Sequence, residues 1–200
     1  MNPTILWFRR DLRLQDHAAL TAAVTRGGPI LAVFICDEQV ENLGAAPKWR
    51  LGASVAALQA ALLTKGNRLI LRRGFALPTL KALVAETGAK AVYWQRAYDP
   101  TSQSRDRAVK AAMLDMDVEA QSFKGHLLFE PWTVQTKAGG FFKVYTPMWN
   151  SVRSRDVPAP LPEPIFIPAP MDFPRTDNLA DWNLGHQMQR GLDIVAGYAR

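Results

Sequence analysis

Between residues 4 and 123 the chain alternates short apolar runs with longer stretches of helical periodicity, and this alternation limits the possible folds more than any other feature. Most of the apolar runs are rich in Val, Ile, Leu and aromatic residues, which is typical of strands buried on both faces. Strands that alternate with helices in this way form a parallel sheet covered by helices. The predicted strands are residues 5–8, 30–36, 68–73, 91–94 and 118–123, and the predicted helices are residues 18–24, 50–63, 77–86 and 101–114.

Right-handed crossovers between parallel strands leave few possible topologies. We therefore expect a doubly wound, Rossmann-like α/β fold, with a five-stranded parallel sheet in the order 3-2-1-4-5 and helices on both faces. Asp16 is the expected N-cap of the first helix, and Thr101 or Ser102 is the expected N-cap of the helix over residues 101–114.

A charged turn follows the first strand, within the sequence ILWFRRDLRL. Open α/β sheets bind ligands where the strand order reverses, outside the carboxyl ends of the strands. In the predicted order this point lies between strands one and four. Residues 9–13 and 95–99 should therefore form the mouth of a binding site, with Asp37 and Glu38 close by. The alternative is a local ion-pair cluster made of Arg9, Arg10, Asp11 and Arg13.

The common catalytic and phosphate-binding motifs are absent from the sequence. Residues 9–13 contain no glycine, so the G-x-G-x-x-G turn is missing, and no G-x-x-x-x-G-K-[ST], G-x-S-x-G or H-E-x-x-H occurs. One cysteine and three histidines argue against a structural zinc site. We assign no catalytic residue and no metal, and we expect Cys36 to be a buried, unreactive thiol. The residues alone indicate an α/β binding module.

The net charge of +6 is compatible with a nucleic-acid partner, although many proteins of other kinds are equally basic. The basic residues are scattered, apart from those near Arg9 and the pair Arg72-Arg73. No apolar window is long enough to span a membrane, and the N-terminus lacks the pattern of a signal peptide. We therefore expect a cytoplasmic protein without a membrane partner.

The sequence changes character after the fifth strand. A short helix is expected over residues 144–155, with Thr146 as its cap, and seven of the fourteen prolines then fall in residues 158–174, which predicts an extended surface linker. Residues 181–200 are helix-like and should either pack back on the sheet or begin a further domain. Trp132, Tyr145 and Trp149 pack locally or face another domain, and their position after the sheet favours the second alternative.

Several segments resemble motifs of the DNA photolyase/cryptochrome family, and they follow one another in the order found there. They are WFRRDLRLQDHAAL (residues 7–20), residues 28–37, Trp49-Arg50, AYDPTSQSRDRAV (residues 97–109) and GGFFKVYTPMW (residues 139–149). The opening motif is fairly specific and the whole set is highly specific. Asn is commoner than His17 at its position in that motif.

This resemblance implies an N-terminal α/β domain, residues 1–130, that binds an antenna chromophore, which in the family is a methenyltetrahydrofolate or an 8-hydroxy-deazaflavin. A helical domain that binds FAD and UV-damaged DNA would follow in cis or act as a split partner. Residues 131–180 would connect the two, and residues 181–200 would start the helical domain. The family's light-driven electron transfer to pyrimidine dimers takes place in the helical domain, so no catalytic residue is carried over to this chain.

The resemblance also suggests residues that bind the antenna. Deazaflavin-binding relatives have an aromatic residue, an acid and an arginine at the positions of Phe34, Asp37 and Arg50, and another acid at Asp99. A further acid of that set is replaced by Ala97, and the Asn-Glu pair of some folate-binding relatives is replaced by Thr101-Ser102. The antenna therefore stays undecided. Arg9 and Tyr98, at the expected mouth, complete the candidate cofactor-binding residues.

Three functions are compatible with these observations. The first is the antenna-binding part of a photolyase-like flavoprotein, similar to deoxyribodipyrimidine photo-lyase but catalytically incomplete as this chain alone. The second is a blue-light signalling module of the cryptochrome type. The third is a free-standing nucleotide-binding regulatory domain, which the glycine-free first turn disfavours.

Overall fold

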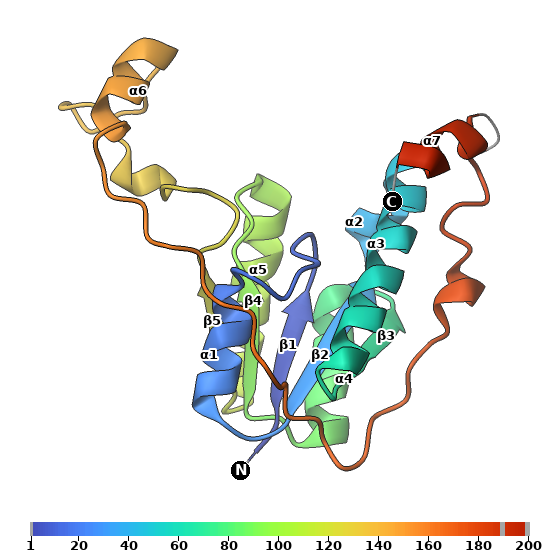
Figure 1. Cartoon of the computed structure of the whole chain (residues 1–200). Coiled ribbons are helices and arrows are strands. Elements are labelled where there is room, and N and C mark those ends of the chain that lie inside the picture. The colour runs from blue at the N-terminus through green and yellow to red at the C-terminus, as the bar shows by residue number, and fades with distance from the viewer. Residues whose placement is uncertain (1, 189–190, 199–200) are drawn as a thin grey trace.

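The computed structural model describes residues 2–188 and 191–198, and its centre is a five-stranded parallel sheet in the order β3-β2-β1-β4-β5 (Figure 1). The expected fold class and strand order are confirmed. The strands are β1 (Thr4–Phe8), β2 (Ile30–Cys36), β3 (Leu69–Arg73), β4 (Ala91–Gln95) and β5 (Glu119–Phe123). The α-helices are α1 (Ala18–Arg26), α2 (Glu38–Glu41), α3 (Ala45–Thr64), α4 (Ala76–Thr87), α5 (Pro100–Asp115), α6 (Tyr145–Val152) and α7 (Leu192–Tyr198).

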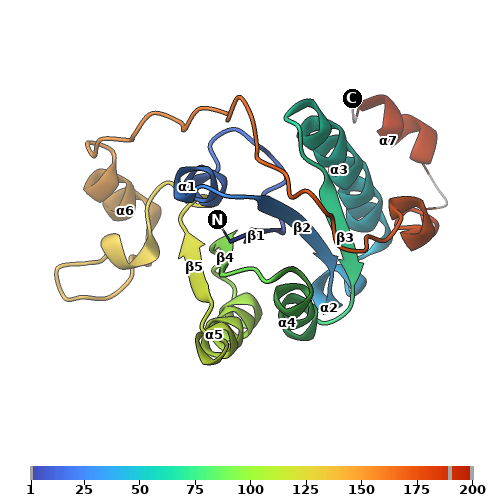
Figure 2. The same ribbon diagram turned by 90° about the horizontal axis from the view of Figure 1, so that it is seen from below.

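Helices cover both faces of the sheet, with α1 and α3 on one face and α4 and α5 on the other (Figure 2). Every residue of β1, β2 and β4 is buried as a result. This explains why these strands are nearly continuous apolar runs, because neither face of a covered parallel strand meets water. Alternate residues of β1 serve the two cores: Leu6 and Phe8 pack toward α1 and α3, whereas Ile5 and Trp7 pack toward α4 and α5.

Three of the expected helix caps are wrong. The first helix is capped by His17 instead of Asp16, because Nδ1 of His17 accepts the hydrogen bond from the backbone N–H of Leu20. Asp16 itself has a positive φ of 49°. In α5 Pro100 is the first helical residue, so the cap is Asp99, two residues before Thr101, and its carboxylate accepts from the N–H of Ser102 at 2.8 Å.

The boundaries of two helices also differ from the prediction. The third helix begins at Ala45, five residues before its expected start at residue 50. Helix α6 begins at Tyr145, so Thr146 lies inside the helix and is not its cap, and Val144 precedes it without a side-chain cap. Helix α2 was not expected. Asp37 caps it by accepting hydrogen bonds from the N–H groups of Gln39 and Val40.

The proline-rich segment is extended, as predicted, but it is also tied to the body of the protein. Ile167 is fully buried, its N–H donates to the carbonyl of Lys65 at 3.0 Å, and the N–H of Ile30 donates to the carbonyl of Pro168 at 2.8 Å. Trp182, in a 3-10 helix over Leu179–Trp182, packs against Phe34 with ring centroids 6.1 Å apart. This part of the chain therefore packs back on the α/β body.

The prediction of one helix over residues 181–200 is wrong for the first part of that range. Residues 184–187 form turns, and within residues 191–198 the helix is α7 (Leu192–Tyr198). Residues 189–190 and 199–200 lie outside the described residues.

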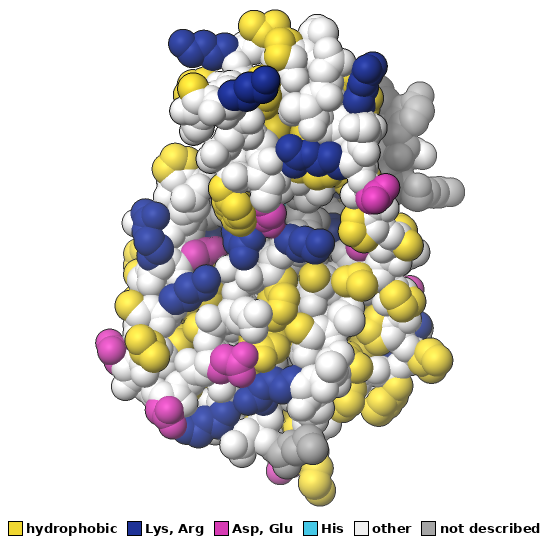
Figure 3. All heavy atoms as spheres, turned by 90° about the vertical axis from the view of Figure 1, so that its left-hand side faces the viewer, with side chains coloured by type: hydrophobic (Ala, Val, Ile, Leu, Met, Phe, Trp, Pro, Cys, Tyr) yellow, Lys and Arg dark blue, Asp and Glu magenta, His cyan; other side chains and the backbone are white. Residues whose placement is uncertain are grey.

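Several large hydrophobic side chains after β5 stay in contact with solvent. Trp132, Tyr145 and Trp149 are 55%, 67% and 47% exposed, and α6 stands away from the sheet (Figure 1). The face in Figure 3 shows hydrophobic side chains beside Lys and Arg side chains. Local packing therefore covers these aromatic residues only in part, and the expected domain interface stays a prediction.

Candidate functional site

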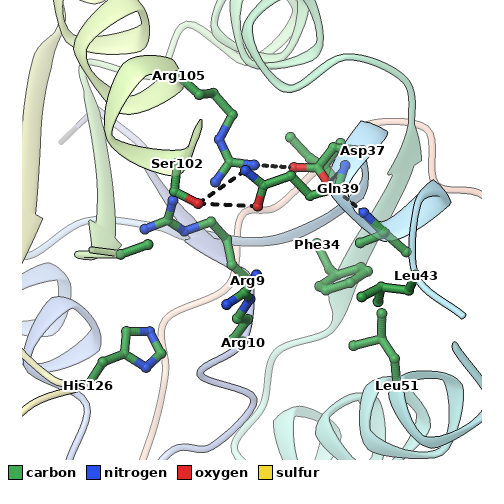
Figure 4. A pocket seen from close by; sticks show the side chains of 13 residues that line it. Arg9, Arg10, Phe34, Asp37, Gln39, Leu43, Leu51, Ser102, Arg105 and His126 are labelled. Atoms are coloured by element: carbon green, nitrogen blue, oxygen red, sulfur yellow. Dashed lines mark hydrogen bonds and ion pairs between the residues drawn. The ribbon is translucent and has the colours of Figure 1, made fainter. Parts of the chain in front are cut away.

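A pocket lies at the carboxyl edge of the sheet, where the strand order reverses between β1 and β4 (Figure 4). The space between its lining residues is about 560 Å³, open solvent included. The position matches the expected mouth, because residues 9–10 after β1 and Ala97 after β4 contribute to it. The lining residues are Arg9, Arg10, Phe34, Ile35, Asp37, Gln39, Val40, Leu43, Leu51, Ala97, Ser102, Arg105 and His126.

Two guanidinium groups are fixed at the inner end of the pocket by the ring of Trp7. The guanidinium carbons of Arg9 and Arg105 each lie 4.8 Å from the centroid of that ring. Arg9 also donates to Asp106 at 2.8 Å and to the backbone carbonyl of Gln95. These contacts hold the cationic groups in place before any ligand arrives, which lowers the entropy cost of binding.

Asp37 is the only acid among the lining residues, and it is already engaged. Its carboxylate accepts from Arg105 at 2.5 Å while it caps α2. Burial raises the pKa of Asp37, and the charge of Arg105 and the N–H groups of α2 oppose this rise. Arg105 is thus paired with Asp37, and Arg9 is paired with Asp106. Arg10 is the lining arginine that forms no ion pair among the described residues, so it gives the pocket its positive character.

A polar bridge joins the two helices on either side of the pocket. The side-chain amide of Gln39 donates to the hydroxyl of Ser102 at 3.1 Å, and that hydroxyl lies 3.2 Å from the amide oxygen of Gln39. Opposite this bridge, Phe34 lies beside Leu43 and Leu51 and forms an apolar wall (Figure 4). The site thus combines an apolar side, in which Phe34 itself is only 1% exposed, with hydrogen-bonding groups and positive charge.

His126 points its ring toward the pocket from the loop after β5 (Figure 4). Partial burial lowers its pKa. Asp11 opposes this effect, whereas Arg9, Arg13 and Arg10 reinforce it. The lowered pKa favours the neutral imidazole as a hydrogen-bonding group. The sequence had suggested only a surface loop histidine, and the side chain is indeed exposed.

The structure brings together three of the six candidate binding residues: Arg9, Phe34 and Asp37. Arg50 lies on an adjoining exposed recess on α3, which shares Arg10, Leu43 and Leu51 with the pocket. The hydroxyl of Tyr98 donates to Glu130 at 2.9 Å and lines a separate groove. Asp99 caps α5 and is not among the lining residues.

Gln39, Ser102 and Arg105 were missed by the sequence interpretation. The sequence could have indicated Ser102 and Arg105, because residues three apart in a helix lie on one face. Once Ser102 is placed in the first turn of α5 at the mouth, Arg105 follows on the same side. Gln39 gave no such signal, since α2 was not predicted.

The described residues contain no cluster of three or more His, Cys, Asp or Glu side chains arranged to hold a metal ion. Within the same residues, no helix has the length and apolar character needed to cross a membrane. Cys36 is buried, as expected, and burial raises the pKa of its thiol to about 11, so it stays protonated at neutral pH.

The fold and the pocket together define a doubly wound α/β protein with an arginine-rich mouth at the switch point of its sheet. A family model described as DNA photolyase matches residues 4–165, and the chain belongs to the DNA photolyase family. This confirms the resemblance carried by the motifs.

Individual relatives support the same assignment. The deoxyribodipyrimidine photo-lyase of Agrobacterium fabrum is 44% identical over 183 residues, which are 91% of this chain and 38% of that protein. Cryptochrome-1 of Arabidopsis thaliana is 36% identical over 151 residues, which are 74% of this chain and 22% of that protein. Identity is thus higher to the photolyase than to the cryptochrome.

A solved structure gives the same result in three dimensions. The bacterial class III photolyase from Agrobacterium tumefaciens superposes with a TM-score of 0.89 at 43% identity, over 92% of this chain and 38% of that one. The chain therefore spans about two fifths of the length of these photolyases.

Proposed function

We propose that this chain is the antenna-binding α/β part of a light-driven DNA photolyase and that the pocket between β1 and β4 holds the antenna chromophore. The observation that supports this most strongly is the pairing of the apolar wall of Phe34, Leu43 and Leu51 with cationic groups at Arg9 and Arg10, of which Arg9 is fixed against Trp7. A flat conjugated ring system with anionic substituents suits both features.

The chain's own residues would divide the work of binding. Phe34, with Leu43 and Leu51, would support the flat ring, and Arg9 and Arg10 would attract the anionic groups. The side chains of Gln39 and Ser102 would offer hydrogen bonds to ring nitrogen and oxygen atoms. When bound, the chromophore supplies absorption of near-ultraviolet or blue light. Methenyltetrahydrofolate and 8-hydroxy-deazaflavin both fit this chemical description.

The proposal includes partners that the family suggests. A helical domain that binds FAD and UV-damaged DNA would complete the enzyme in the cytoplasm. The exposed Tyr145 and Trp149, whose rings stack on each other, are suitable for contact with such a domain, because large exposed apolar groups commonly mark interfaces. Residues 131–180 would then be the connection, and the helical domain would begin within residues 181–200, of which Trp182 still packs on the α/β body. In this account the present chain supplies no catalytic group.

Titration of the purified protein with each chromophore tests the proposal and selects the antenna. We expect saturable binding of one of the two, at one molecule per chain, with a shift in its absorption and a change in its fluorescence. No spectral change with either chromophore at concentrations up to 100-fold above the protein would contradict the proposal. Dimer repair by a longer form of the protein, with absent repair pointing to cryptochrome-type signalling, tests the full activity separately.

A further inference from the structure

We propose that a second groove, on the outer side of α5, binds a nucleoside monophosphate. The groove is formed by α5, the ends of β4 and β5 and the 3-10 helix Pro131–Thr133, and its volume is about 990 Å³, part of it open to solvent. Its important side chains are Arg96, Tyr98, Arg107, Lys110 and Trp132. The inference does not depend on antenna binding, because none of these side chains lines the first pocket.

Trp132 provides a surface on which a flat heterocycle can stack. Its side chain is 55% exposed, and the guanidinium carbon of Arg96 lies 5.1 Å from the centroid of its ring. Arg96 is held in turn by Glu130, at 2.9 Å, and by the carbonyl of Ser122, at 3.0 Å. An exposed indole supported by a fixed cation is a suitable platform for a nucleobase, since every base has a π-face.

The groove also carries positive charge that no acid in it neutralises. Neither Arg107 nor Lys110 forms an ion pair among the described residues, although the ammonium of Lys110 donates to the hydroxyl of Ser122 at 3.0 Å. Both acids nearby are engaged: Asp106 accepts from Arg9 at 2.8 Å and from the indole N–H of Trp94 at 2.9 Å, and Glu130 binds Arg96 and Tyr98.

The positive side chains are well placed to bind a phosphate attached to a stacked ring. Arg107 and Lys110 are three residues apart, so they lie on one side of α5. A heterocycle on Trp132 with its phosphate near α5 would use both features, whereas inorganic phosphate would use only one of them.

The groove and the first pocket are neighbours with separate linings. Ala97 contributes to both, and Arg9 of the first pocket is paired with Asp106 of the groove. Substitutions of Trp132 and Arg10 should therefore separate the two sites in a binding experiment.

The test uses calorimetric titration of the whole chain with AMP and with FMN, and with adenosine and riboflavin as the unphosphorylated controls. We expect AMP or FMN to bind at least tenfold more tightly than its unphosphorylated form. Trp132→Ala should weaken this binding at least tenfold, Trp132→Phe less than threefold, and the pair Arg107→Gln with Lys110→Gln should remove the preference for the phosphorylated form. Arg10→Ala should leave it unchanged.

Several results would overturn the proposal. One is the absence of binding at low millimolar nucleotide in 50 mM salt. Another is binding that is unchanged in Trp132→Ala. A third is displacement of the nucleotide by an equal concentration of inorganic phosphate. A single-stranded oligonucleotide that binds more than a hundredfold more tightly than its mononucleotide would assign the groove to nucleic acid instead.

Discussion

At the scale of single residues, the buried pair of Asp11 and His17 holds the turn after β1 together. Nε2 of His17 lies 2.9 Å from a carboxylate oxygen of Asp11, and both side chains are fully buried. Nδ1 accepts from the N–H of Leu20, so the ring proton is on Nε2 and is donated to Asp11. The carboxylate also accepts from the N–H of Arg9 at 2.8 Å. One histidine thus caps α1 and satisfies a buried acid.

Replacing His17 by Ala should lower the free energy of unfolding by about 2–4 kcal/mol, since a lost cap costs about 1 kcal/mol and an unsatisfied buried acid about 1–3 kcal/mol. Urea denaturation measures the change. His17→Asn is the matched control, because Asn keeps a capping oxygen, and it should cost less than half as much. An unfolding free energy of His17→Ala within 0.5 kcal/mol of the wild type would show that the pair has no structural role.

The same pair predicts a dependence of stability on pH. Burial raises the pKa of Asp11, but the hydrogen bond from His17, the N–H of Arg9 and the charge of Arg9 outweigh it, and the net pKa is lowered. A lowered folded-state pKa contributes stability that is complete above the unfolded value of about 3.9 and is lost as the pH falls through the folded value. The stability difference between the wild type and Asp11→Asn should therefore shrink below about pH 4. A constant difference between pH 7 and pH 3 would contradict this.

At the scale of elements, the extended linker contributes to the core through one residue. Ile167 is fully buried, whereas Ile165, two residues earlier, is 93% exposed. Ile167→Ala should lower the free energy of unfolding by about 2–4 kcal/mol, because it removes buried methylene groups and leaves a cavity. Ile165→Ala should change it by less than 0.5 kcal/mol. Equal effects of the two substitutions in urea denaturation would mean that the linker does not dock as described.

Asp99 has two candidate roles, as the N-cap of α5 and as a ligand of the antenna, and substitutions can distinguish them. As a cap, Asp99 should tolerate replacement by Asn, since both residues cap helices well, whereas Asp99→Ala should cost about 1 kcal/mol. As an antenna ligand it would need its charge. Affinity for the chromophore should therefore be unchanged in Asp99→Asn. A tenfold loss of chromophore affinity in Asp99→Asn, with unchanged stability, would show that the Asp99 carboxylate contacts the chromophore.

At the scale of the whole molecule, the sequence predicted what depends on continuous patterns. The apolar runs of β1, β2 and β4 located the sheet, and the handedness of crossovers gave its order and the position of the mouth. It could not predict contacts that cross the mouth. Arg105 pairs with Asp37, although the two residues are 68 positions apart in the sequence. Arg50 was assigned to the pocket but lines the adjoining recess on α3. The predicted caps were wrong because a shift of one to three residues in the start of a helix changes which side chain precedes it.

The central claim, that the pocket at the switch point holds the antenna, is tested most directly by comparing chromophore affinity in Arg10→Ala and Lys81→Ala. Both side chains are exposed, so both variants should fold, but only Arg10 lines the pocket. We predict that Arg10→Ala weakens binding of the anionic chromophore about tenfold and that Lys81→Ala leaves it within twofold of the wild type. Equal affinities of the two variants would place the antenna elsewhere.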